Sequence, residues 1–240
     1  MYSIDDFLGG RIRLKQPAKG LRVTSDAVLL ASCVPDDAAG TLLDMGCGSG
    51  ILALSIAERT KNITALGVDI QQELIDLAKE NAEMNGLSDR VSFRCDNVTE
   101  KGFLKGVLFD YVITNPPFYS ESPLDTPLMK SVAHHEKDSD FLIKWIDSSL
   151  RHLKAKGRFF MLHKPERFSE ILPLLSAKLG ALTVKPIYSR AGDSASRIVV
   201  SGVLNSRKPF AILPPLIVHE SDGSFTKEAE MILRGDSQAF

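Results

Sequence analysis

An alternation of short apolar runs with amphipathic helical patterns begins at residue 41, and it constrains the fold more than any other feature. Five apolar runs read as strands, at residues 41–46, 62–70, 90–96, 109–115 and 157–164. The helical patterns lie at residues 49–60, 71–87, 140–157 and 165–180. Such alternation builds βαβ units, in which parallel strands form one sheet with helices on both faces. We therefore expect an α/β fold with a mostly parallel sheet.

The segments outside this alternation divide the chain into three parts. Residues 1–40 suggest a hairpin that turns around Pro17–Gly20, followed by a short apolar helix capped near Thr24, Ser25 or Asp26. Residues 41–205 carry the alternating pattern and end in two extended stretches that are expected to form an antiparallel pair. Residues 206–240 predict an irregular strand and a short helix.

Composition and charge exclude several classes of protein. No apolar run approaches the ~20 residues of a membrane helix, and the opening MYSIDDFLGG lacks the features of a signal peptide, so we expect a cytoplasmic protein. Cys33, Cys47 and Cys95 lack metal-ligand spacing, which predicts reduced thiols and no metal site. The net charge is -1, but basic residues cluster at 11–22 and 154–167, and a local basic face can hold phosphates.

A glycine-rich loop, DMGCGSG, joins the first of these strands to a helix. Gly46, Gly48 and Gly50 permit a tight turn and let a ligand approach the backbone. The spacing is G-x-G-x-G, whereas the nicotinamide-dinucleotide fingerprint is G-x-G-x-x-G. Asp44 stands just before the loop, where it would repel a pyrophosphate but suits a ligand with a cationic amino group. A tight turn without a ligand is the alternative.

Acidic residues end the next two strands. Asp69 ends the second strand, where a carboxylate can accept both ribose hydroxyls of an adenosine, cap the following helix, or do both. Asp96 and Asn97 end the third strand; they suit the amino group of an adenine, or form an ordinary polar loop. In parallel sheets, ligands lie beyond the carboxyl ends of the strands. We therefore expect these residues and the glycine-rich loop at one site.

The fourth strand stops abruptly at NPPF, residues 115–118. Proline has no backbone N–H and fixes its own φ, so Pro116 and Pro117 end the strand and form a rigid turn. Asn115 and Phe118 then stand at the same sheet edge as the loop and the acidic residues.

Together these motifs resemble the class I S-adenosylmethionine-dependent methyltransferases over residues 40–205. The resemblance implies a Rossmann-like fold, with a seven-stranded sheet whose last strand is antiparallel and helices on both faces. It also implies S-adenosylmethionine as cofactor. Cofactor contacts are expected at Asp26, Asp44, Gly46, Gly48, Gly50, Asp69, Asp96, Asn97 and Asn115.

NPPF resembles the motif of amino methyltransferases, which act on planar, conjugated nitrogens. The resemblance implies that the Asn115 side-chain oxygen and a carbonyl of the Pro-Pro turn, supplied by Pro116, each accept one N–H of the target amine. Rigid acceptors of this kind hold the amine and free its lone pair. Phe118 would stack on the planar target, which completes the expected catalytic set.

Residues 8–31 resemble the opening of bacterial methyltransferases that modify N6 of an adenine beside the anticodon of a valine tRNA. VAHHE, residues 132–136, resembles a His-Glu segment of the same family, with His134 where arginine is more usual. The resemblance implies tRNA as partner and residues 1–40 as a cover for the cofactor. Substrate contacts are expected at Pro117, Tyr119, His135, Arg11, Arg13 and Lys15, although His135 and Glu136 could instead lead into the next helix. Phosphate contacts are expected at the basic residues of 11–22, with Arg190, Arg197, Arg207 and Lys208.

Other functions stay open. The same chemistry serves glutamine N5 of a protein factor or guanine N2 of rRNA, although those families usually have a longer segment than 40 residues before the sheet. A nicotinamide-dependent oxidoreductase is disfavoured by the loop spacing and by NPPF. A non-catalytic nucleotide-binding module would bind the cofactor, yet loss of the Asn115 side chain would leave cellular tRNA modified.

Overall fold

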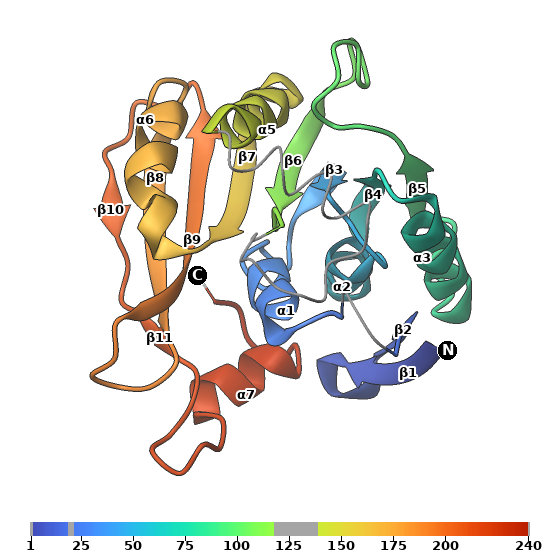
Figure 1. Ribbon diagram of the computed structural model, residues 1–240, viewed down its shortest axis with the longest axis vertical. Coiled ribbons are helices and arrows are strands. Elements are labelled where there is room, and N and C mark those ends of the chain that lie inside the picture. Colours follow the sequence, from blue (N-terminus) through green and yellow to red (C-terminus); the bar gives the residue numbers. More distant parts are fainter. Residues whose placement is uncertain (1, 19–21, 118–138, 240) are drawn as a thin grey trace.

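One mixed β-sheet forms the middle layer of the fold (Figure 1). The structure is a computed structural model that describes residues 2–18, 22–117 and 139–239. In chain order the strands of this sheet are β3 (Ala39–Met45), β4 (Asn62–Asp69), β5 (Val91–Cys95), β6 (Phe109–Thr114), β7 (Leu153–His163), β8 (Leu179–Tyr188), β9 (Ala195–Leu204), β10 (Ala211–Ile212) and β11 (Leu216–Ile217).

The strand order confirms the expected sheet. Neighbours follow β10-β8-β9-β7-β6-β3-β4-β5, and β11 also pairs with β8. Strand β9 runs antiparallel to β7 and β8, whereas the other pairs are parallel. The seven longer strands are therefore the predicted set with an antiparallel last member. The two-residue strands β10 and β11 come from the segment expected to form one irregular strand, and they widen the sheet beyond β8.

Helices cover both faces because alternate residues of the central strands point to opposite sides. Leu42 and Phe160 join a core beneath α1 (Ser25–Ala31), α2 (Ile51–Arg59), α3 (Gln72–Met84) and α7 (Lys227–Leu233). Leu43 and Phe159 join a second core beneath α5 (Ser139–Arg151) and α6 (Phe168–Ser176). A 3-10 turn, η2 (Pro165–Arg167), leads from β7 into α6. Among the described helices, none is both long and apolar enough to cross a membrane.

The N-terminal hairpin turns at a different place from the one predicted. Strands β1 (Tyr2–Phe7) and β2 (Ile12–Pro17) pair across the 3-10 turn η1 (Leu8–Gly10), not across Pro17–Gly20. Gly9 and Gly10 have φ of 64° and 89°, and these left-handed conformations suit glycine in a tight turn. Proline fixes φ and ends a strand more readily than it closes a hairpin, so Pro17 is the last residue of β2.

The boundary between α5 and β7 also differs from the prediction. The helical pattern was expected to continue through residue 157, but α5 ends at Arg151 and β7 begins at Leu153. Leu153 is buried and pairs with Phe109 of β6, and the register then shifts before Tyr111. Pairing with the buried neighbouring strand thus overrides the helical preference of LKAK, since propensity is a weak prior.

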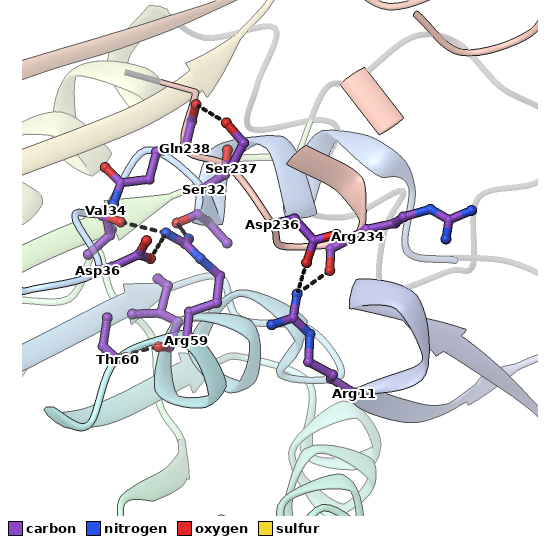
Figure 2. A network of polar contacts seen from close by, with 12 residues as sticks. Arg11, Ser32, Val34, Asp36, Arg59, Thr60, Arg234, Asp236, Ser237 and Gln238 are labelled. Atoms are coloured by element: carbon purple, nitrogen blue, oxygen red, sulfur yellow. Dashed lines mark hydrogen bonds and ion pairs between the residues drawn. The ribbon is translucent and has the colours of Figure 1, made fainter. Parts of the chain in front are cut away.

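Contacts between distant segments fix α1 and the hairpin (Figure 2). The Arg59 side chain, only 3% exposed, donates to the carbonyls of Ala31 at 2.9 Å and Val34 at 3.1 Å, and it pairs with Asp36. On the hairpin, Arg11 donates to the carbonyl of Arg234 and to the Asp236 carboxylate. The Ala239 N–H also donates to the Ser32 carbonyl, so the C-terminal segment contacts the end of α1.

Replacing Arg59 by Ala should lower the free energy of unfolding by about 2–3 kcal/mol, because two buried carbonyls lose their donor. Urea unfolding followed by circular dichroism measures this change. Arg11→Ala is the matched control: its side chain is 41% exposed, so a loss of no more than about 1 kcal/mol is expected. Equal losses of unfolding free energy in the two variants would contradict the conclusion that Arg59 is the main side chain that holds the end of α1 in place.

Candidate functional site

A cavity of about 220 Å³ opens where β3, β4, β5 and β6 end. Each strand end singled out from the sequence contributes to its wall: Gly46 and Gly48, Asp69, Asp96 and Asn97, and Asn115 with Pro117. Because parallel strands end at one edge of a sheet, residues far apart in the chain meet there. The expected site is therefore a real cavity, and these seven residues are brought together.

The glycine-rich loop forms the floor of this cavity and uses its backbone donors internally. Gly46 and Cys47 donate to the Val68 carbonyl at 2.8 and 3.0 Å. Gly48 donates to the Asp69 carboxylate at 3.0 Å, and Gly50 to the Cys47 carbonyl at 2.9 Å. A pyrophosphate site instead presents backbone N–H groups to the ligand. This geometry speaks against a dinucleotide.

Asp44 lies behind the loop rather than in the cavity wall. Its side chain is fully buried, and one oxygen accepts the Ala53 N–H in the first turn of α2 at 3.3 Å. The other oxygen has no partner among the described residues. Burial, with a smaller contribution from the nearby Asp69 charge, raises the pKa of Asp44 to about 8. Asp44 therefore supports the start of α2, and its predicted cofactor contact stays a prediction.

Gly50 is likewise a packing residue. It is absent from the cavity wall, it has a φ of 92°, and a Cβ there would lie 2.6 Å from the Phe93 ring. Gly46 does line the cavity, and a Cβ on it would lie 3.1 Å from the Trp145 ring. The two glycines are thus required for different reasons, one by the core and the other by the cavity.

Asp69 organises the second strand end and also faces the cavity. Its two oxygens accept the N–H groups of Gly48 and Gln71, both at 3.0 Å. The side chain is 8% exposed, and burial raises its pKa, while the two N–H donors act in the opposite direction. It therefore fixes the turn before α3. Each carboxylate oxygen keeps a second lone pair that can accept a ligand hydroxyl.

Asp96 and Asn97 form an ordered polar loop after β5. Asp96 accepts the Asn97 N–H at 2.8 Å and pairs with Arg94 at 2.7 Å. The Asn97 side-chain oxygen accepts the Thr99 N–H at 3.0 Å. The loop is therefore held by its own hydrogen bonds while it lines the cavity.

Asn115 presents an unused acceptor to the site. Its side-chain oxygen is buried and has no partner in the described part of the chain. Such an atom costs about 1–3 kcal/mol unless a ligand satisfies it. The preceding Thr114 hydroxyl donates to the Met45 carbonyl at 2.8 Å and accepts from the Trp145 indole at 2.9 Å, which fixes the strand end.

The remaining residues of the NPPF region are described only in part. Pro116 is buried, and Pro117 lines the cavity. Phe118, Tyr119 and His135 lie outside the described residues, so their predicted roles stay predictions.

Sequence reasoning missed part of the wall. Trp145 is packed, with 7% of its side chain exposed, and it also lines the cavity with Phe141, whose ring centre lies 5.4 Å away. Their i, i+4 spacing places both on one helix face, which was the available signal. Arg22 and Thr24 close another side and were not predicted as lining residues.

The Cys47 thiol lines the cavity but is not a nucleophile. Burial, and then the Asp44 and Asp69 carboxylates, raise the pKa of Cys47 well above its usual range, so it stays protonated. A neutral thiol is a poor nucleophile. No covalent enzyme intermediate is assigned to this residue.

Several predicted contact residues lie away from the wall. Asp26 pairs with Arg197 at 3.0 Å, and Lys15 with Glu80 at 2.6 Å. Arg11 holds the C-terminal segment, while the Arg13 backbone pairs with the Asn85 side chain. None of these predicted residues is among those that line the cavity. These contacts give the four residues structural surroundings outside the cavity wall, and their predicted cofactor and substrate contacts stay predictions.

The other expected phosphate contacts divide between the two ends of the sheet. Because β9 is antiparallel to β7, Arg207 and Lys208 follow it at the edge opposite the cavity. Arg190, which follows β8, belongs to the cavity edge.

The fold and site define a class I S-adenosylmethionine-dependent methyltransferase. Residues 22–186 match the family described as methyltransferase small domain, and the chain belongs to that family. The described residues suit the cofactor, since the carboxylates of Asp69 and Asp96 and the amide of Asn97 line the cavity and can bind the hydroxyl and amino groups of an adenosine. The enzyme uses S-adenosylmethionine as its methyl donor.

Individual relatives agree with this family. A tRNA1(Val) (adenine(37)-N6)-methyltransferase from Dyadobacter fermentans is 33% identical over 162 residues, 65% of each chain. One from Porphyromonas gingivalis W83 is 25% identical over 237 residues, covering 93% of this chain and 91% of the relative. The crystal structure of a predicted O-methyltransferase from Agrobacterium tumefaciens is 25% identical, with a TM-score of 0.74, and covers 89% of this chain and 97% of its own.

Replacing Asp44 by Asn should change how stability depends on pH. The pKa of Asp44 is raised from 3.8 to about 8. Between these two pH values the folded protein therefore keeps a proton that the unfolded chain has already released. Wild-type stability should therefore fall relative to the variant as pH rises through this window, by up to about 1.4 kcal/mol per pH unit, and level off above it.

Urea unfolding of the ligand-free protein at several pH values measures this difference. Asp37→Asn, at an exposed position, is the control and should show no such slope. A difference between Asp44→Asn and wild type that stays constant from about pH 4 to 8 would mean that Asp44 is ionised in the folded protein.

Proposed function

We propose that this enzyme methylates N6 of an adenine in the anticodon loop of a valine tRNA. One observation carries the proposal: the buried, unpartnered Asn115 oxygen stands at a Pro-Pro turn in the wall of the cofactor cavity. The names of the Dyadobacter and Porphyromonas relatives support the substrate, and the second aligns over most of both chains.

An exocyclic amine needs help to react because its lone pair is delocalised into the ring. The Asn115 oxygen accepts one N–H of the amine, and a carbonyl of the Pro116–Pro117 turn accepts the other. These contacts orient the nitrogen and favour the pyramidal geometry in which its lone pair is free. The bound cofactor supplies an electrophilic methyl group on a good leaving group. The extra proton on the nitrogen leaves to solvent after transfer, so no strong base is required.

The acceptor geometry is set before the substrate arrives. Thr114 ties the end of β6 to Met45 on β3, and Trp145 holds Thr114 from α5. Proline then removes the freedom of the next two residues. A preorganised acceptor needs no reorganisation during the reaction, which is the main source of its catalytic effect.

The substrate must reach the cavity as a single strand. A base in an anticodon loop turns outward at little cost compared with one in a duplex. Arg190 and Lys164 follow β8 and β7 at the cavity edge of the sheet, where cations can hold backbone phosphates. A tRNA substrate supports our expectation of a cytoplasmic enzyme.

The first test is transfer of labelled methyl from S-adenosylmethionine into RNA from cells that lack the enzyme, followed by nucleoside analysis. Wild type should yield N6-methyladenosine in tRNA. Asn115→Ala should lower kcat by about 10²–10³-fold, as removal of one preorganised hydrogen-bonding group does. Cofactor affinity should change less than about twofold, because the lost contact serves the amine.

The matched control is Asn62→Ala, which removes an exposed asparagine at the opposite end of the sheet and should leave kcat unchanged. Label recovered in protein or in rRNA would reject tRNA as the substrate while leaving the methyltransferase assignment intact. Full activity of Asn115→Ala would reject the role of the amide.

A further inference from the structure

Arg22 is the one basic side chain among the described residues that line the cavity. The acidic residues in that wall are Asp69 and Asp96. S-adenosylmethionine carries two positive centres and one carboxylate. The wall thus offers carboxylates for the polar and cationic parts of the cofactor, and a single cation for its anionic part.

The glycine-rich loop leaves few donors for that carboxylate. As described above, the N–H groups of Gly46, Cys47, Gly48 and Gly50 all donate within the loop or to β4 and its end. An anion at this floor finds none of these four groups free. A buried or half-buried anion needs a charged or hydrogen-bonding partner, so the partner must come from another wall.

The order of the strand ends indicates which wall of the cavity supplies the partner for the carboxylate. Across the sheet, the order β6-β3-β4-β5 places Asn115, the glycine-rich loop, Asp69 and Asp96 in a row. A ligand with its adenosine over β4 and β5 has its amino-acid part over β3. There α2 begins directly after the loop, and α1 packs on α2, with Arg22 and Thr24 immediately before α1. Arg22 therefore lies on the side of the cavity where such a ligand would have its amino-acid part.

The Arg22 guanidinium is already oriented from its other side. It donates to the Asp5 carboxylate at 2.9 Å, to the Ser3 hydroxyl at 3.1 Å and to the Pro17 carbonyl at 3.5 Å. The buried Gln16 side chain donates to Asp5 at 2.6 Å and accepts the Val23 N–H at 2.8 Å. Three of the five guanidinium donors are thus engaged, and two remain, which is enough for a bidentate contact with a carboxylate.

We propose that Arg22 binds the carboxylate of the amino-acid part of S-adenosylmethionine and is positioned for this by Asp5 and Gln16 of the hairpin. The hairpin thereby acts on cofactor affinity although its strands lie outside the cavity wall. This proposal depends only on the cofactor, so it stands or falls separately from the tRNA assignment.

The test compares the binding of two ligands by isothermal titration calorimetry. S-adenosylhomocysteine carries the amino-acid carboxylate, whereas methylthioadenosine has the same adenosine thioether without it. Arg22→Ala should weaken S-adenosylhomocysteine about tenfold or more, the effect of losing a charged hydrogen bond, and methylthioadenosine less than about twofold. Arg22→Lys, which keeps the charge but loses the bidentate geometry, should fall between wild type and Arg22→Ala.

Arg13→Ala is the matched control, since Arg13 is an exposed arginine of the hairpin and lies outside the cavity wall. It should leave both affinities unchanged. Asp5→Asn should weaken S-adenosylhomocysteine selectively but less than Arg22→Ala does, because it removes only the orienting charge.

Two outcomes would overturn the proposal. Equal weakening of both ligands by Arg22→Ala would show that Arg22 only supports the shape of the wall. Unchanged affinity for both ligands, with a raised KM for tRNA, would show that it contacts substrate phosphate instead. Thermal melting of each variant confirms that the compared proteins are folded.

Discussion

The site depends on the hydrogen bonds that turn the glycine-rich loop onto the neighbouring strand. Gly46 and Cys47 donate to Val68, and Gly48 donates to Asp69. These bonds use the loop N–H groups internally, so these groups are not offered to the ligand. The charged groups of the ligand must therefore be bound by side chains around the rim, while the loop at the floor sets the shape of the cavity. This division explains how one G-x-G loop can serve a cationic cofactor and a related loop a pyrophosphate.

The reacting end of the cavity depends on the opposite face of the sheet. Trp145 belongs to the core beneath α5, yet its indole reaches the Thr114 hydroxyl at the edge of the sheet. Gly46 makes room for this ring, since a side chain there would meet it. The cofactor floor, the strand end and the α5 layer therefore meet at one point. A change in the packing of α5 would be transmitted directly to the orientation of Asn115.

Sequence reasoning succeeded where a local pattern determines the position of a side chain. Residues at the ends of parallel strands or directly after them, such as Asp69 and Asn115, meet at one edge whatever the rest of the chain does. It missed contacts between segments that are distant in the chain, such as the pairing of Arg11 with Asp236. The bond from Ala53 to Asp44 was also missed, because the motif gives the strand end but not which way the side chain turns.

The contact of the C-terminal segment with α1 has a consequence for synthesis of the chain. The Ser32 carbonyl accepts the Ala239 N–H, and Arg11 donates to residues 234 and 236, so both elements gain these contacts only after residues 234–239 have been made. At ribosomal speed this delay is on the order of ten to forty seconds. The sheet can form during that interval, but the wall that carries Arg22 gains its final support last. A nascent chain is thus a folded sheet before it is a competent enzyme.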